Sequence, residues 1–243
     1  MRSILGHYPK FRQRYLKHIK QHKGPDNIRQ LISIPAMAQL VYTTQDLTER
    51  AIIIFLAKTG IRRKELILLD LSDIDLDTGI IYLKPTKKRS TRVAFIDQEG
   101  IEVLKDNLST RATDDSLRAL FVHKGRRVSR NYVYNIVRNN AERLGFHNPD
   151  GLLIEKFTPH CCRHWFTTHL RRAGMSREFR QALRGDVVKD AVDIYDHIDL
   201  EELRGDYLDK IPQLKQALLC QAADVDIRKP GRQTVLGMYS DPA

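Results

Sequence analysis

The sequence predicts a mainly helical α+β protein with one small antiparallel sheet. Apolar residues recur at helical spacing through most of the chain, between Ser, Thr and Pro signals for helix starts and Gly signals for helix ends. Two short runs rich in Ile, Val, Tyr and Phe interrupt this pattern, "IIYL" at 80–83 and "TRVAFI" at 91–96. With 243 residues, of which 42% are apolar, the chain is long enough to bury a sizeable core.

Start and stop signals delimit three helices in the first part of the chain. Ser33 and Pro35 begin a helix through "AMAQLV". The strongly apolar segment "LTERAIIIFLAK" (47–58) predicts a second helix that ends at Gly60, and "RRKELILLDL" (62–71) predicts a third. The turn-rich segment "SDIDLDTG" then separates this helix from the first β-type run.

The two β-type runs predict a hairpin, because only "KPTKKRS" lies between them. Its loop is unusually basic. Five cations fall within nine residues: Lys84, Lys87, Lys88, Arg89 and Arg92. A helix is expected over roughly 98–108, and "ALFV" (119–122) is a candidate third strand.

Helices also fill the second half of the chain. One begins after Ser129 and ends at Gly145, and another begins at Thr158 and Pro159 and runs to a stop at Gly174. Shorter helices are then predicted for "SREFRQAL", for a piece containing "AVDIY", for "LEELRGDYLDKI", and for residues 213–222. From Asp224 onwards the sequence has no clear periodicity.

The composition favours a polyanionic partner inside the cell. The net charge is +11 and the pI is about 9.6, a balance that is typical of nucleic-acid-binding proteins. The longest apolar run, "AIIIFLA", is far shorter than the roughly 20 residues that a membrane span needs, so no membrane partner is expected. Three cysteines, two of them adjacent, do not form a disulfide framework, and we expect a cytoplasmic protein.

The segment "TPHCCRHWFTTHL" (158–170) is dense in residues that can bind metals. However, position 161 is Cys rather than the Glu of a zincin motif, and adjacent Cys161 and Cys162 point about 100° apart on a helix. We therefore expect no metal, and we expect the two cysteines to pack as small buried hydrophobic residues. His160 and Arg163, in contrast, share a face of the first helical turn, where N–H groups attract anions such as phosphate.

Other residues suited to phosphate chemistry recur in a fixed order. "TGIRRKEL" places Arg62 after a glycine turn with Glu65 three residues on, and "LRGDVVKDAVDIYDHI" places Tyr195 ten residues after a glycine. Together with the lysine-bearing hairpin and "HCCRH", these boxes resemble the tyrosine recombinases, the phage-type integrases and Xer-type resolvases. The resemblance spans roughly residues 30–210 and implies the catalytic-domain fold of these DNA breaking-rejoining enzymes. The "LRGD" variant is similar to archaeal integrases.

The resemblance implies a site-specific DNA recombinase that works through a phosphotyrosine. Tyr195 would attack the scissile phosphate, giving a 3′-phosphotyrosine and a free 5′-hydroxyl, and a 5′-hydroxyl of a second strand would reverse the step. Arg62 and Arg163 would stabilise the charge on the phosphate, His160 would assist proton transfer, and Glu65 would buttress the site. Neither a metal nor a high-energy cofactor is implied.

The family also has a lysine in the hairpin loop that protonates the leaving oxygen. Counting back from Arg92, Lys87 is the best match, and Lys84 and Lys88 remain alternatives because the loop is about one residue longer than the common pattern. The rest of the basic run, including Arg89, is expected to contact backbone phosphates.

One position departs from the family. Nine residues before the tyrosine, where His or Trp is usual, this chain has Asp186, whose carboxylate would be repelled by a phosphate. Asp186 could turn away and brace Arg163 or another cation, a neighbour such as Arg184 or His197 could supply the missing donor, or the enzyme could be weakened. We favour the first. His164 is expected to pack or to orient its neighbours.

Two alternative functions follow. A type IB topoisomerase would share this site but relax supercoils without pairing two DNA sites, and a DNA-binding relative would keep the fold without catalysis. We expect a basic arm or linker at 1–27 without a full N-terminal DNA-clamping domain, a catalytic domain at 28–212, and a C-terminal helix and tail at 213–243 that packs on a neighbouring protomer. We expect this packing to give a homotetramer on paired sites of double-stranded nucleoid DNA. Without DNA we expect a monomer.

Overall fold

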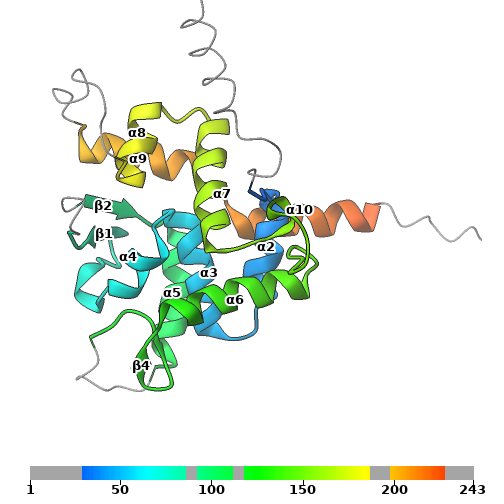
Figure 1. Cartoon of the computed structure of the whole chain (residues 1–243). Coiled ribbons are helices and arrows are strands. Elements are labelled where there is room, and N and C mark those ends of the chain that lie inside the picture. Colours follow the sequence, from blue (N-terminus) through cyan, green and yellow to red (C-terminus); the bar gives the residue numbers. More distant parts are fainter. Residues whose placement is uncertain (1–28, 86–91, 112–117, 187–197, 228–243) are drawn as a thin grey trace, which may run out of the picture.

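A computed structural model of the chain describes residues 29–85, 92–111, 118–186 and 198–227. These residues fold into helices and two small antiparallel sheets of two strands each, which confirms the predicted mainly helical α+β class. Figure 1 shows helix α3 in the middle of the molecule and the β1–β2 hairpin at one side. The predicted helical piece around Tyr195 lies outside the described residues.

Helix α3 (Leu47–Thr59) is the centre of the core. Asp46 caps its first turn, and Gly60 ends it in the left-handed conformation, as the sequence predicts. Every residue from Ala51 to Thr59 is buried, because helices cover α3 on several sides. Four helices pack against it: α2 (Ile34–Tyr42), α5 (Gln98–Ser109), α6 (Arg130–Arg143) and α7 (Pro159–Arg172).

The predicted starts of α2, α6 and α7 are confirmed. The hydroxyl groups of Ser33 and Ser129 accept hydrogen bonds from backbone N–H groups of the first turn of α2 and of α6, at 3.2 and 3.1 Å. Helix α7 begins at Pro159, directly after Thr158, whose side chain makes no capping hydrogen bond.

The hairpin of β1 (Ile80–Leu83) and β2 (Arg92–Phe95) is also as predicted, with Leu83 opposite Arg92 at the end nearest the loop. The candidate third strand at 119–122 is wrong, since these residues do not join this sheet. Ala119 instead forms an isolated bridge with Asp70. Val122 belongs to a separate ribbon of β3 (Val122–His123) and β4 (Arg126–Arg127).

Helix α7 lies between two clusters of buried side chains. One of its faces contributes Trp165 to the main core around α3, and another contributes Phe166 and Leu170 to a second cluster under α8 (Arg177–Arg184) and α9 (Leu200–Lys210). The Phe166 ring leaves no room for a Cβ atom at position 60, so the glycine after α3 allows α7 to approach. This close approach fixes the distance between the two helix ends that carry the candidate site.

Helix α10 (Leu214–Ile227) is longer than the predicted segment 213–222. It packs against α2 of the same chain, and its first residue, Leu214, is buried in the main core. Farther along, Leu219 is 70% exposed. Packing of this helix on a neighbouring protomer stays a prediction.

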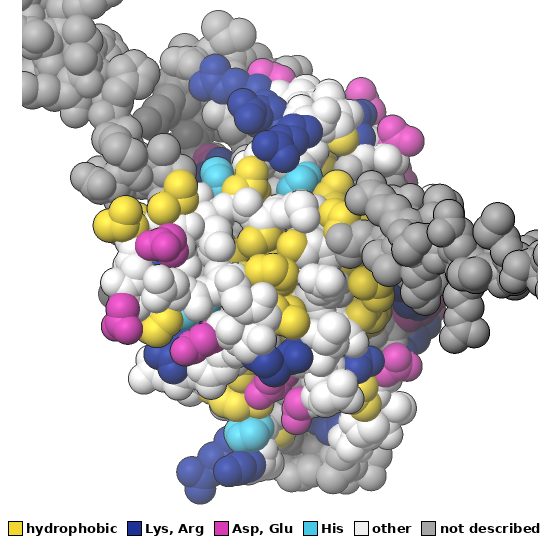
Figure 2. Space-filling model, turned by 90° about the vertical axis from the view of Figure 1, so that its right-hand side faces the viewer, with side chains coloured by type: hydrophobic (Ala, Val, Ile, Leu, Met, Phe, Trp, Pro, Cys, Tyr) yellow, Lys and Arg dark blue, Asp and Glu magenta, His cyan; other side chains and the backbone are white. Residues whose placement is uncertain are grey.

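Charged and apolar side chains are unevenly distributed over the surface. On the face shown in Figure 2, Lys and Arg side chains gather at the upper edge, and hydrophobic side chains lie near the middle. None of the helices in the described part of the chain has the length and apolar character that crossing a membrane requires. Two short 3-10 turns, η3 (Leu71–Asp73) and η4 (Leu153–Glu155), complete the described elements.

Candidate active site

Arg62 occupies the N-cap position of the short helix α4 (Arg63–Leu68), just after the left-handed turn at Gly60. Its backbone N–H donates to Glu65 Oε2 at 2.7 Å, and its Nη1 lies 3.5 Å from Glu65 Oε1. Glu65 is buried, and the positive charges of Arg92 and Arg62 lower its pKa despite the opposing effect of burial. Glu65 is therefore an ionised carboxylate, and it holds the side chain and backbone of Arg62 in place.

Arg163 projects from the first turns of α7 and is only 4% exposed. Its Nη1 donates to the Gly60 carbonyl at 2.6 Å, and its Nη2 donates to the Arg184 carbonyl at 2.7 Å. Burial and the nearby charge of Arg62 lower its pKa from the usual value. Two backbone carbonyls from distant parts of the chain thus fix the direction of this guanidinium.

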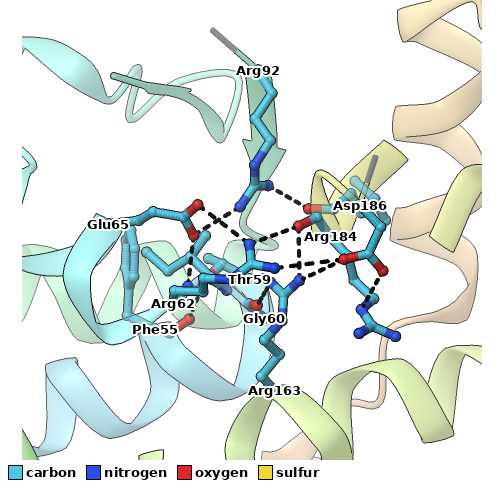
Figure 3. A network of polar contacts seen from close by, with 11 residues as sticks. Phe55, Thr59, Gly60, Arg62, Glu65, Arg92, Arg163, Arg184 and Asp186 are labelled. Atoms are coloured by element: carbon cyan, nitrogen blue, oxygen red, sulfur yellow. Dashed lines mark hydrogen bonds and ion pairs between the residues drawn. The ribbon is translucent and has the colours of Figure 1, made fainter. Parts of the chain in front are cut away.

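Arg62 and Arg163 meet at the C-terminal end of α8. Arg62 Nη1 also donates to the Arg184 carbonyl, at 3.2 Å, so that both guanidinium groups share one acceptor. Figure 3 shows Arg163 reaching this point from α7, with Glu65 and Asp186 on opposite sides of the pair. The structure therefore brings together the two arginines that the sequence selects, although 101 positions separate them.

Asp186 lies within this cluster. Its Oδ1 is 3.5 Å from both Arg62 Nη2 and Arg163 Nη2, and its Oδ2 is 3.0 Å from Arg184 Nε. The carboxylate contacts three cations, as the favoured interpretation of a bracing residue expects. It lies beside both Arg62 and Arg163 (Figure 3).

His160 and His164 follow each other by one turn along α7. His160 is exposed, and His164 is partly buried. Desolvation and the charges of Arg29 and Arg163 lower the pKa of His160, and desolvation together with Arg184 lowers that of His164. Both imidazoles are therefore neutral at pH 7 and able to accept a proton.

His160 and the arginine pair border an open pocket with a volume of about 340 Å³. The starts of α4, α6 and α7 meet at this pocket. The residues that line it are Ile61, Arg62, Arg63, Lys64, Arg130, Tyr134, Thr158, Pro159, His160 and Arg163. None of these residues is acidic, so the pocket is suited to an anion such as a DNA phosphate.

Four polar residues of this pocket are not predicted from the sequence: Arg63, Lys64, Arg130 and Tyr134. The Arg63 guanidinium lies 5.6 Å from the centre of the Tyr134 ring, which is cation–π geometry. The available signal was the basic first turn of the helix after Ser129, but its proximity to α4 depends on how the helices pack.

Lys84 and Arg92, two predicted DNA contacts, are engaged within the chain. Lys84 Nζ lies 2.5 Å from Asp70 and 3.1 Å from Asp73, and these carboxylates raise its pKa. Arg92 pairs with Glu65 and with the α8 terminus. Contact of either residue with DNA stays a prediction.

Several predicted site residues lie outside the described part of the chain: Lys87, Lys88, Arg89, Tyr195 and His197. One end of each stretch nevertheless adjoins a residue of the polar network around Arg62 and Arg163. Arg92 directly follows residues 86–91, and Asp186 directly precedes residues 187–197.

The cysteines behave as predicted. Cys161 and Cys162 are free, fully buried members of the main core, and burial raises the pKa of the Cys162 thiol. In the ranges that the structure describes, no group of three or more His, Cys, Asp or Glu residues is arranged to hold a metal ion.

The sequence matches the model of the phage integrase family over residues 24–202. Among curated proteins, tyrosine recombinase XerC of Pelotomaculum thermopropionicum is 29% identical over 209 residues, which cover 82% of this chain and 64% of the relative. Tyrosine recombinase XerC of Thermodesulfovibrio yellowstonii is 32% identical over 165 residues, covering 64% and 52%. Tyrosine recombinase XerD of Bifidobacterium longum is 29% identical over 214 residues, covering 81% and 67%.

Solved structures of a recombinase and an integrase are also similar to this chain. The XerA recombinase superposes with a TM-score of 0.59 at 27% identity, over 76% of this chain and 66% of that one. An integrase from mycobacterium phage Brujita, with a TM-score of 0.60 and 18% identity over 82% and 65% of the two chains, shares the fold. The chain spans about half to two thirds of the length of these curated relatives.

Proposed function

Because the chain belongs to the phage integrase family, we propose that it is a site-specific DNA recombinase that cleaves and rejoins DNA through a phosphotyrosine. The observation that carries this proposal is the convergence of Arg62 and Arg163 on the Arg184 carbonyl, beside a basic pocket that His160 also borders. Two fixed guanidinium groups at one point match the non-bridging oxygens of a single phosphate.

In the proposed reaction the Tyr195 oxygen attacks the scissile phosphorus, and the bond from phosphorus to the 5′-oxygen breaks. The tyrosine proton passes to His160, and Lys87 protonates the leaving 5′-oxygen. A 5′-hydroxyl of another strand then attacks the phosphotyrosine, and the tyrosine leaves. Since each step exchanges one phosphate ester for another, neither a metal nor a high-energy cofactor is needed.

The protonation state of His160 supports its role as the proton acceptor. A free tyrosine has a pKa near 10 and needs a base at neutral pH. The lowered pKa of His160 leaves its imidazole neutral at pH 7. Arg62 and Arg163 would meanwhile attract the negative charge that develops on the phosphate.

We propose double-stranded DNA as the substrate and a homotetramer on two paired sites as the active assembly. A structure of XerH recombinase bound to its difH substrate shares the fold of this chain, with a TM-score of 0.54 at 22% identity. The pocket, with six cationic or imidazole side chains and no acid among its lining residues, supports DNA as the partner.

The position of Asp186 beside both arginines favours a second candidate function, a DNA-binding protein with weak or no cleavage activity. A carboxylate 3.5 Å from both arginines competes with a phosphate for the same guanidinium groups. Recombination remains the preferred function because the cluster retains both arginines, Glu65 and His160.

A covalent-trapping assay tests the proposal. Duplexes that the protein binds are first selected from a random-sequence library, and each is then nicked so that the cleaved fragment diffuses away and traps the intermediate. We expect an adduct that survives SDS with the wild-type chain and none with Tyr195→Phe. No adduct on a duplex that the wild type binds would contradict cleavage, and an adduct with Tyr195→Phe would contradict this nucleophile. Relaxation of a supercoiled plasmid that holds a single site would favour a topoisomerase.

A further inference from the structure

Arg92, the first residue of β2, connects three elements of the cluster. Its side chain is 11% exposed, its Nη2 donates to Glu65 Oε2 at 2.8 Å, and its Nη1 donates to the Leu183 carbonyl at the end of α8. Figure 3 shows Arg92 extending from β2 towards the group formed by Glu65, Arg62 and Arg184. Its charge is therefore directed into the protein, towards a buried carboxylate.

The end of α8 is shaped to receive this side chain. Gly185 has a φ of +57°, and a Cβ atom at this position would overlap the Cδ and Nε atoms of Arg92. Glycine thus serves here both for the left-handed turn that ends α8 and for the close passage of Arg92. The Leu183 and Arg184 carbonyls lie at a helix C-terminus, where such groups lack partners within the helix.

Both contacts of Arg92 lead directly to the arginine pair. Glu65 Oε2 accepts from Arg92 and also from the backbone N–H of Arg62, at 2.7 Å. The Leu183 carbonyl that Arg92 binds is adjacent in sequence to the Arg184 carbonyl that receives Arg62 and Arg163. A displacement of Arg92 would therefore move both groups that orient the two phosphate-binding guanidinium groups.

We propose that Arg92 is a positioning residue for DNA cleavage: it holds Glu65 and the end of α8 together so that Arg62 and Arg163 point at one phosphate. This inference rests on the proposed recombinase function. It replaces the predicted backbone contact of Arg92 with DNA by a role inside the protein.

The test separates positioning from DNA contact. Arg92→Gln and Arg92→Lys are compared with the wild type for DNA affinity at several salt concentrations, for the single-turnover rate of adduct formation at saturating DNA, and for urea unfolding. We expect both variants to keep the affinity and its salt slope within twofold, and to form adduct about 100-fold more slowly. Lys does not restore the rate because its single amine cannot bind Glu65 and Leu183 in the guanidinium geometry.

Two results would overturn the proposal. Weaker binding with a shallower salt slope and a normal rate at saturation would make Arg92 a DNA contact. Full rescue of both rate and stability by Arg92→Lys would make it a structural charge only. Arg130, an exposed residue of the pocket, provides the comparison. Arg130→Gln is expected to weaken DNA binding and to reduce the salt slope of the affinity.

A further measurement does not depend on cleavage. If the wild type binds DNA but forms no adduct, the proposed function fails. The contact between Arg92 and Glu65 is then tested by carbon NMR titration of the Glu65 carboxyl group. Loss of the Arg92 charge in Arg92→Gln should raise the pKa of Glu65. An unchanged Glu65 titration would show that Arg92 does not hold this carboxylate.

Discussion

The guanidinium groups of Arg62 and Arg163 donate to one carbonyl oxygen, that of Arg184, at 3.2 and 2.7 Å. Two like charges at one point repel each other, so the protein must supply compensating negative groups. Glu65 on one side and Asp186 on the other supply them (Figure 3). The protein itself consequently holds the pair in place, which is the condition for effective stabilisation of a transition state in the proposed reaction.

Asp186→His should have opposite effects on binding and on cleavage. Removing a negative charge beside the phosphate position should tighten DNA binding about fivefold, which corresponds to about 1 kcal/mol for a partly exposed ion pair. Losing the brace should slow adduct formation about tenfold at saturating DNA. Binding isotherms and single-turnover trapping measure the two effects separately.

Glu178→Gln is the matched control, because Glu178 is an exposed acid in the first turn of α8, the helix that ends just before Asp186. It should leave both quantities within twofold of the wild type. An unchanged or faster cleavage rate with Asp186→His would contradict the bracing role.

Arg130→Gln should weaken binding to any duplex by a similar factor, because a phosphate contact is blind to sequence. Arg130 begins α6 and lines the pocket. Loss of one phosphate contact should reduce the slope of log K against log salt by about 0.9. Fluorescence anisotropy with a labelled duplex at several salt concentrations measures this slope.

Lys105→Gln, on α5, removes an exposed cation from a helix that contributes nothing to the pocket. Its slope should equal that of the wild type. Equal slopes for Arg130→Gln and the wild type would show that the α6 side of the pocket does not contact DNA.

Acid should destabilise the fold in two stages. The pKa values of the partly buried His164 and the buried His169 are lowered by burial, so on acidification the unfolded chain takes up protons first, and stability falls below pH 6.5. The pKa values of Glu65 and Glu99 are lowered by their basic partners, so their contribution is present above pH 4.5 and is lost as the pH falls further.

Urea unfolding between pH 7.5 and pH 3.5 measures both stages. His164→Gln should reduce the loss between pH 7 and pH 5 without changing the second stage. A free energy of unfolding that stays constant from pH 7 to pH 5 would contradict the first stage.

Local signals in the sequence were sufficient for most of the fold. Ser33, Ser129 and Gly60 act within one helical turn, and the structure confirms the boundaries that they predict. The exceptions depend on distant contacts. Ala119 bridges to Asp70, and the first turn of α10 is bound by Glu99, neither of which a local pattern reveals.

The site divides in the same way. Motif spacing and family resemblance selected Arg62, Arg163 and Glu65, and the structure brings them together. The internal contacts of Arg92 could not be predicted, because a basic hairpin has the same sequence whether its arginine faces DNA or a buried carboxylate. Arg130 was missed because only the packing of α6 against α4 places it at the pocket.

A buried ionic group anchors the start of α10. Lys58 on α3 is completely buried, and its Nζ lies 2.6 Å from Asp97, 2.5 Å from Glu99 and 2.7 Å from the Pro212 carbonyl. Glu99 also accepts hydrogen bonds from the backbone N–H groups of Leu214 and its neighbour at the start of α10. One ammonium group thus supplies the positive charge that faces two buried carboxylates.

Lys58→Met should therefore lower the free energy of unfolding by about 3–5 kcal/mol, because it leaves buried charge without a partner. Urea unfolding followed by circular dichroism measures the change. The triple variant Lys58→Met, Asp97→Asn, Glu99→Gln should recover part of the loss, since an uncharged group of similar volume costs less to bury. A loss below about 1 kcal/mol in the single variant would show that the carboxylates find other partners, and that Lys58 does not anchor α10.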